Sequence, residues 1–238
     1  MLSAQRSRPA GRGHQRGLSL VEMMVGIAVG LIVVAAAATL VAAQLSDNRR
    51  LLLEVQVQQD LRASADIITR DLRRAGSWSG PIAGAIVGIW KEGSPAQANS
   101  NLADLSPADD VADSVTFRSS RTEGSDGPYT YLLDEGVIKF QPAPGLGFQH
   151  LTDSSTMRIT EFNVTALPEP EIRVACPKLC ADGSQTCWPT IGVRSYVVEI
   201  TGQAVSDPAV VRSIRSVVRM RNDAVAFDPL NPTQACPA

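Results

Sequence analysis

The chain has 238 residues, which leaves room for one long helix and one globular domain of about 150 residues. Its formal net charge is −2, and only 5% of its residues are aromatic. Because nucleic-acid-binding proteins carry basic surfaces and stack bases on aromatic rings, this composition argues against a nucleic acid as the partner.

Residues 1–17 form a basic leader, and residues 18–45 form an apolar segment in which Glu22 is the only charged residue. A helix of these 28 residues would be roughly 40 Å long, enough to cross a bilayer. A carboxylate so near the start of such a segment costs a few kcal/mol in hydrocarbon, so we expect it to have a function. The leader contains four arginines and no acidic residue: Arg6, Arg8, Arg12 and Arg16.

The residues Gly17, Leu18 and Glu22 resemble the processing signal of the type IV prepilin family. That signal is a basic leader, a Gly, a hydrophobic first mature residue and a Glu at mature position five. The resemblance implies that a membrane prepilin peptidase cuts after Gly17 and methylates the new amino terminus at Leu18, and that Glu22 serves assembly. Removal of the leader arginines would lower the formal charge from −2 to −6. Leu18 replaces the usual Phe, and Thr39 stands about where the family often has a kinking Pro, which leaves the curvature of the helix open.

Two other interpretations of the amino-terminal region are a secretory signal peptide and a plain single-pass anchor. A signal peptide could be cut after the small residues at 35–37 or 41–43, but its apolar region would be shorter and would lack Glu22. A plain anchor has no use for a glutamate beside a Gly-Leu step. Gly26 and Gly30 either allow another helix to approach closely or are ordinary residues of an apolar helix.

After Leu45 the chain becomes polar but keeps a helical period as far as Gly76, which predicts one helix over residues 18–76. The charged residues between 60 and 74, Asp71 among them, are expected on the other faces. The predicted apolar stripe consists of Leu51, Val55, Gln58, Leu61, Ala65, Ile68, Leu72 and Ala75.

Residues 77–238 are predicted to form a β-rich head, because short β-branched and aromatic runs alternate with turn residues. No strand alternates with a helix, so we expect an α+β, pilin-like fold with an antiparallel sheet packed on the long helix. Residues 133–137 predict a tight hairpin with φ > 0 at Gly136, and residues 91–112 and 142–155 predict loops. The predicted strands are 85–90, 114–118, 129–133, 137–141, 157–166, 171–175, 194–201 and 210–221.

Two short stretches refine the resemblance. Residues 67–76 look like the helix end of PilW-type minor pilins, and residues 218–222 look like their final strand; minor pseudopilins of type II secretion are related. A minor pilin of this kind primes type IV pilus assembly at or near the tip, in systems for cell adhesion and twitching motility. The implied partners are the prepilin peptidase, other minor pilins, the major pilin and the inner-membrane assembly platform. The protein would lie in the inner membrane as a single-pass protein with a periplasmic head, and later in the pilus filament.

The four cysteines all follow the apolar segment, whose basic flank marks the cytoplasmic side, so they face an oxidising compartment and are expected in disulfides. Four cysteines allow three pairings. We favour Cys180–Cys187, closing over a turn at residues 182–184, together with Cys176–Cys236. The spacing fits no common zinc module, and no histidine is nearby, so no metal is expected.

No pattern predicts catalysis or a cofactor. His150 lies in a Gly- and Ser-rich loop with no nucleophile elbow, Asp109-Asp110 lacks the offsets of a calcium loop, and residues 145–147 lack the rest of a phosphate loop. We expect a structural assembly subunit and not an enzyme. The alternatives are a type II secretion minor pseudopilin, a membrane-anchored extracytoplasmic binding module, and a membrane-anchored enzyme.

The processing signal makes a first prediction. Mass spectrometry of the membrane-extracted protein should find a chain that begins at N-methylated Leu18. A chain beginning near Gln44 would instead identify a signal peptide and contradict the prepilin interpretation.

Overall fold

The computed structural model describes residues 17, 19–77, 105–108, 111–119, 127–168, 170–228 and 236. The chain forms two compact units, Met1–Arg49 and Arg50–Ala238, which we describe separately. The boundary lies within the predicted helix of residues 18–76, so the second half of that helix belongs to the head. The predicted strand at residues 85–90 lies outside the described residues.

Helix α1 (Leu20–Arg74) is continuous over 55 residues, close to the predicted bounds. The Thr39 hydroxyl donates to the Ala36 carbonyl at 2.8 Å, and the helix passes this position without a break. The expected stop at Gly76 is confirmed: its φ is 73°, and its N–H leaves the helix to donate to the Arg118 carbonyl at 2.7 Å.

One face of α1 within the head is completely buried, but it begins later than predicted. The prediction is wrong for Leu51 and Val55, which are 57% and 53% exposed, whereas Val57 is buried. A sheet must lie opposite the helix for its apolar residues to be buried, and Leu61 has Gly202 close by: a Cβ added there would lie 3.3 Å from Cδ2 of Leu61. The buried stripe consists of Val57, Leu61, Ser64, Ala65, Ile68, Thr69, Asp71, Leu72 and Ala75.

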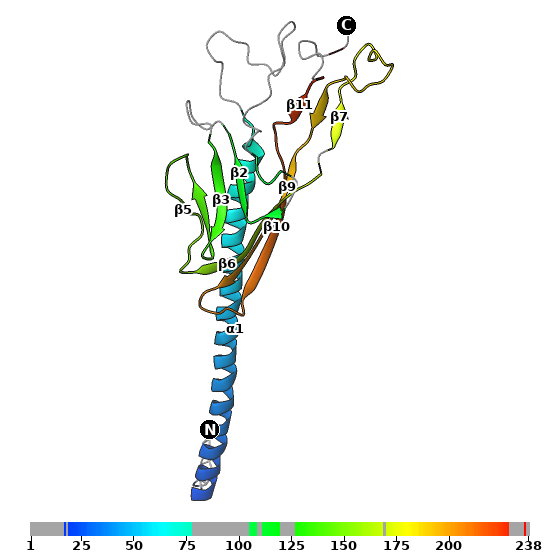
Figure 1. The fold of residues 1–238 in the computed structure, drawn as a ribbon. Coiled ribbons are helices and arrows are strands. Elements are labelled where there is room, and N and C mark those ends of the chain that lie inside the picture. The colour runs from blue at the N-terminus through cyan, green and yellow to red at the C-terminus, as the bar shows by residue number, and fades with distance from the viewer. Residues whose placement is uncertain are drawn as a thin grey trace, which may run out of the picture. The chain divides into compact units, whose positions relative to one another are not determined.

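The strands form three sheets, and every strand pair is antiparallel among the described residues, as predicted (Figure 1). The first sheet has the order β1 (Val111–Ala112), β6 (Met157–Ala166), β9 (Ser195–Ala204) and β10 (Val211–Arg219). The second has the order β2 (Ser114–Phe117), β3 (Tyr129–Asp134), β4 (Val137–Gln141) and β5 (Gln149–His150). The third has the order β11 (Ala224–Ala226), β8 (Thr190–Gly192) and β7 (Glu171–Arg173).

The long strands lie close to their predicted positions, and the strands that sequence analysis missed are short. They are β1, β5, β8 and β11, with two or three residues each. Strand β5 lies in the segment predicted to be a loop, and β1 lies at the end of another. Such short strands carry no alternation of polar and apolar residues long enough to recognise, and pairing with neighbouring strands forms them.

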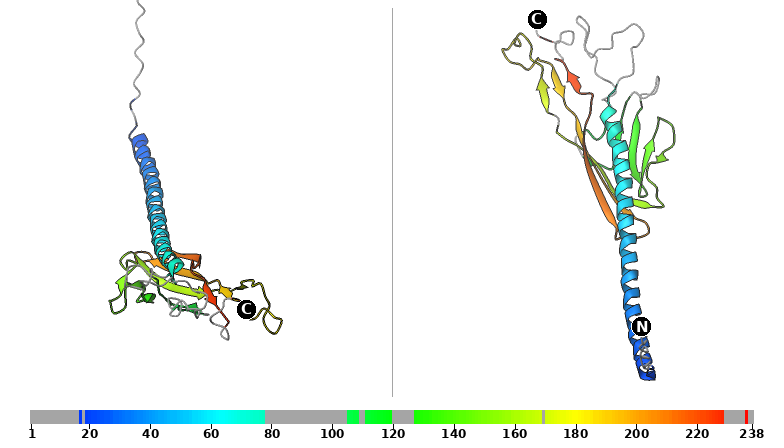
Figure 2. Two further views of the ribbon diagram at one scale, coloured as in Figure 1. Left: turned by 90° about the horizontal axis from the view of Figure 1, so that it is seen from above. Right: turned by 180° about the vertical axis from the view of Figure 1, so that it is seen from behind.

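The core of the head lies between the buried face of α1 and the inward faces of the two four-stranded sheets, which flank this part of the helix (Figures 1 and 2). An aromatic cluster of Phe117, Tyr129, Tyr131 and Phe140 fills one side, with ring centroids 4.6 to 6.3 Å apart. Asp71, which was expected on an exposed face, is 7% exposed and accepts a 2.6 Å hydrogen bond from the Tyr131 hydroxyl. That bond satisfies part of the hydrogen-bonding capacity of a carboxylate that is buried away from water.

Glycine is required at two positions of the head. In the predicted hairpin between β3 and β4, Glu135 and Gly136 have φ of 52° and 82°, as a two-residue type I′ turn demands. A Cβ at Gly136 would also lie 2.8 Å from Cγ of Arg158. A Cβ at Gly202 would lie 2.9 Å from Sδ of Met157 and 3.3 Å from Cδ2 of Leu61, so β9 needs glycine there to approach the helix.

The contributions of Leu61 and Leu51 to the free energy of unfolding can be compared in a head that begins at Asn48. Leu61→Ala removes a fully buried side chain and should lower the free energy of unfolding by about 2–5 kcal/mol. Leu51→Ala is the matched control and should change it by less than about 0.5 kcal/mol, because Leu51 is exposed. Urea unfolding of both variants checks this, and equal losses would show that the buried stripe extends to Leu51.

Candidate functional site

The predicted cleavage position lies next to the start of α1. Gly17 and Ser19 lie outside the helix, and the first helical hydrogen bond runs from the N–H of Met23 to the Ser19 carbonyl at 3.1 Å. Leu18 lies outside the described residues. Gly17 is exposed, and a Cβ there would meet no atom within 4 Å. Gly17 therefore precedes the first helical hydrogen bond, and a peptidase that cuts after it would not have to break that bond.

Glu22 lies in the first turn of α1, where the partial positive charge of the helix amino terminus favours a carboxylate. Its side chain is exposed, and no ion pair joins it to another residue in the part of the chain that the structure describes. In water this carboxylate is stable without a partner. In hydrocarbon it needs a cation, and cutting before Leu18 would create one four residues away along the chain.

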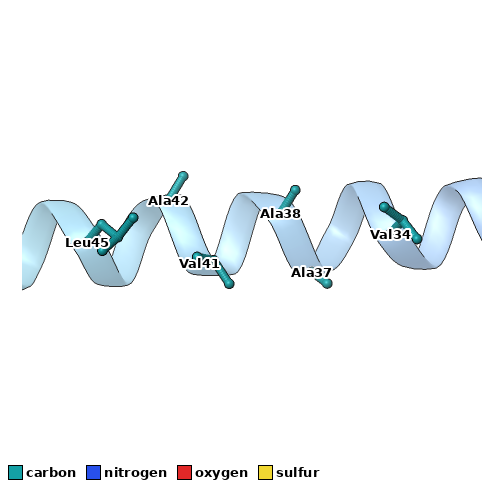
Figure 3. A pocket seen from close by; sticks show the side chains of 6 residues that line it. All are labelled: Val34, Ala37, Ala38, Val41, Ala42 and Leu45. Carbon is teal, nitrogen blue, oxygen red and sulfur yellow. The ribbon is translucent and has the colours of Figure 1, made fainter.

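No other described residue of its own unit covers the first half of α1. Every described residue from Ser19 to Arg50 is exposed, and the helix is long and apolar enough to cross a membrane. Six residues line a shallow apolar groove on one face, at spacings that put them on one side of the helix (Figure 3). They are Val34, Ala37, Ala38, Val41, Ala42 and Leu45. The three alanines let the backbone of another helix approach closely.

Gly26 and Gly30 are also open to an approaching helix. A Cβ at either position would meet no atom within 4 Å. Small residues allow close packing between helices in a membrane. The structure therefore leaves this face of the helix open.

The stretches at residues 67–76 and 218–222 meet each other at the end of α1. The N–H of Arg221 donates to the Arg73 carbonyl at 3.0 Å, and the side-chain amide of Asn222 donates to the Ala75 carbonyl at 3.0 Å. The last carbonyls of a helix lack partners within the helix. Residues that follow β10 supply partners for these carbonyls, which gives the two stretches a structural role in the head.

The four cysteines are joined as Cys176–Cys236 and Cys180–Cys187, the pairing that sequence analysis favoured. The second bond closes a loop in which Gly183 has a φ of 79° and donates its N–H to the Cys180 carbonyl at 2.8 Å. Hydrogen bonds from the hydroxyl and the N–H of Ser184 lower the pKa of Asp182 in this turn. The loop is therefore held by both covalent and polar contacts.

The residues considered for catalysis or metal binding are not brought together. His150 is exposed on β5, Asp109 and Asp110 lie outside the described residues, and Gly145 lies in an exposed turn. Among the described residues, no group of three or more His, Cys, Asp or Glu side chains is placed to hold a metal ion. A surface hollow between α1 and residues 151–157 contains Asp60 and Asp153. Hydrogen bonds from Ser155 lower the pKa of Asp153.

Two family models match this chain. The model described as "Prepilin peptidase-dependent protein B" matches residues 50–220, and the model described as "Prokaryotic N-terminal methylation motif" matches residues 12–38. The first match covers most of the head, and the second includes Gly17, Leu18 and Glu22. Comparison with curated proteins and with solved structures gave no match.

The disulfides should contribute unequally to the stability of the head, because a bond that closes a longer loop removes more entropy from the unfolded chain. The Cys176–Cys236 bond spans 60 residues and the Cys180–Cys187 bond spans 7. Paired Cys→Ser substitution should cost about 4 kcal/mol for the first bond and about 2 kcal/mol for the second. Urea unfolding of the two double variants measures both losses, and non-reducing peptide mapping of the parent should find two disulfides and no free thiol. A larger loss for the short loop would contradict the prediction.

Proposed function

The chain belongs to the prepilin peptidase-dependent protein B family, and from this we propose that it is a minor pilin which takes part in assembly of a type IV pilus, at or near the filament tip. The observation that carries the proposal is the combination of a prepilin methylation motif with an exposed apolar helix that continues into a β-rich head. We further propose that the protein is not an enzyme.

Processing prepares the chain for assembly. The motif match and the family description support cleavage by a prepilin peptidase, which removes the leader after Gly17 and exposes the Leu18 amine. Methylation leaves that amine able to carry a proton, so its positive charge remains. The chain then begins with one cation and has one carboxylate, Glu22, four residues later.

The charge pair gives the helix a defined position in a filament. Each of these ions would cost several kcal/mol to desolvate, and pairing Glu22 with an amino terminus, its own or that of a neighbour, offsets this cost. A shift of one helical turn, about 5.4 Å, would leave both charges unpaired where the dielectric constant is low. Glu22 therefore sets the axial register between subunits.

The apolar surface supplies the driving force. Residues 18–45 lie in the inner membrane before assembly and against the helices of other pilins afterwards, and the alanine-lined groove and the two open glycines allow these helices to pack closely. The partners of this step are other minor pilins, the major pilin and the inner-membrane assembly platform. The head, held by two disulfides, faces the periplasm and later the exterior.

Substitutions at Glu22 and Gly17 separate assembly from processing. Glu22→Ala should be cut normally but should assemble poorly, because the Leu18 amine would lose its buried partner. Gly17→Phe should block cutting, because the position before the cut then carries a bulky side chain. Immunoblotting for precursor and mature forms, together with recovery of the subunit in sheared filaments, measures both effects.

Glu22→Gln is the matched control for Glu22→Ala, since it keeps the size and polarity of the side chain but removes its charge. It should assemble as poorly as Glu22→Ala if charge pairing is the cause. Recovery of Glu22→Ala in filaments at the level of the parent chain would refute the charge-pairing role. Recovery of the mature protein only in a short periplasmic pseudopilus would point to type II secretion, and normal pilus assembly without the protein would favour a membrane-anchored binding module.

A further inference from the structure

Strand β7 forms an outer edge of the three-stranded sheet β11-β8-β7 (Figure 1). All three of its residues are exposed, and Ile172 is 55% exposed. An open edge of this kind presents backbone N–H and C=O groups that another strand can pair with. Neither Glu171 nor Arg173 has an ion-pair partner among the described residues.

The hydrogen bonds to β8 show which backbone groups of β7 face outward. The N–H of Val174 donates to the Pro189 carbonyl at 2.8 Å, and the N–H of Val193 donates to the Pro170 carbonyl at 3.4 Å. Along an antiparallel pair, successive residues direct their backbone N–H and C=O groups alternately toward and away from the partner strand. Ile172 lies two residues from both of these contacts, so its backbone groups point to β8. The N–H and C=O groups of Glu171 and Arg173 therefore point to the open edge. Pro170 lies two residues from Ile172, so its backbone is also turned to β8. The N–H that proline lacks is therefore not missing from the open edge.

The charges on β7 are self-complementary. If two copies pair antiparallel about Ile172, Glu171 of each copy lies opposite Arg173 of the other, and these are the residues whose backbone groups face outward. The pair would make four backbone hydrogen bonds and two opposite-charge cross-strand contacts. The two Ile172 side chains would meet on the other face of the sheet, because successive side chains alternate.

The apolar face of the sheet would become continuous through this pairing. Ile172 lies opposite Ile191, which lies opposite Val225, so one row of β-branched residues crosses the three strands. Joining two copies at β7 extends this row across six strands. The other edge strands of the described sheets lack this complementarity: β1, β2, β5 and β11 contain no Asp, Glu, Lys or Arg, and the charged residues of β10 are all arginines.

We propose that β7 is a self-pairing edge through which the heads of two copies of this chain associate as a two-fold symmetric pair, with Glu171 of one copy opposite Arg173 of the other. The partner is a second copy, because β7 has the charge order that an antiparallel copy of itself would match. Such an interface is isologous and closes after two subunits. The proposal does not depend on the role in pilus assembly.

The test is disulfide trapping of the full-length chain in its own membrane. At the two-fold axis, opposed residues form a non-hydrogen-bonded pair with Cα atoms about 4.5 Å apart, which is within the range that a disulfide spans. Among the described residues every native cysteine is already paired, so Ile172→Cys adds the one free thiol. With a mild oxidant it should give a dimer on a non-reducing gel. Val217→Cys, at a residue that is 58% exposed on the edge strand β10, is the matched control and should give only the background of random collisions.

Charge substitutions in the Ile172→Cys chain test the pairing itself. Glu171→Arg turns both opposite-charge contacts into like-charge contacts and should lower the dimer yield about tenfold. Adding Arg173→Glu exchanges the two charges and should restore the yield to that of Ile172→Cys alone. Lys178→Glu, a charge reversal outside β7, should leave it unchanged. A yield for Ile172→Cys no higher than for Val217→Cys, or an exchange variant that stays as low as Glu171→Arg, would overturn the proposal.

Discussion

The head is built on the burial of one stripe of α1 between Val57 and Ala75. This stripe packs against residues from both four-stranded sheets, so each sheet buries an apolar face only because the helix is there. Gly202 marks the closest approach, since even a methyl group at that position would collide with Met157. An antiparallel sheet with one wet face needs such a partner, because its other face is apolar.

The same constraint explains how polar groups at the helix end are satisfied. The Arg73 and Ala75 carbonyls accept hydrogen bonds from Arg221 and Asn222, at the far end of the chain. Asp71 accepts one from Tyr131 in the second sheet. A carboxylate and free carbonyls in a core would cost more than the packing gains if they lacked such partners. The helix end is thus tied to segments that are distant in sequence.

The amino-terminal unit is suited to an apolar environment and not to water. The described residues of its helix are exposed, and their apolar surface is unfavourable in water unless lipid or other helices cover it. The long apolar helix and the match to the prepilin methylation motif together fit a membrane-anchored pilin. Glu22 is the one charged residue of the apolar segment 18–45, so its carboxylate needs a partner where water is excluded.

The sequence by itself determined the features that depend on local pattern. The leader, the apolar run, Glu22, the stop at Gly76, the β3–β4 turn and most long strands follow from charge, periodicity and turn chemistry, which need no distant partner. Tertiary structure decided where burial begins on α1. Leu51, Val55 and Val57 differ little in hydrophobicity, yet Val57 belongs to the core of the head whereas Leu51 and Val55 are exposed. It also decided that Asp71 is buried, because Tyr131 lies opposite it, and that strands as short as β8 and β11 form, because their partners supply the hydrogen bonds that so few residues cannot provide alone.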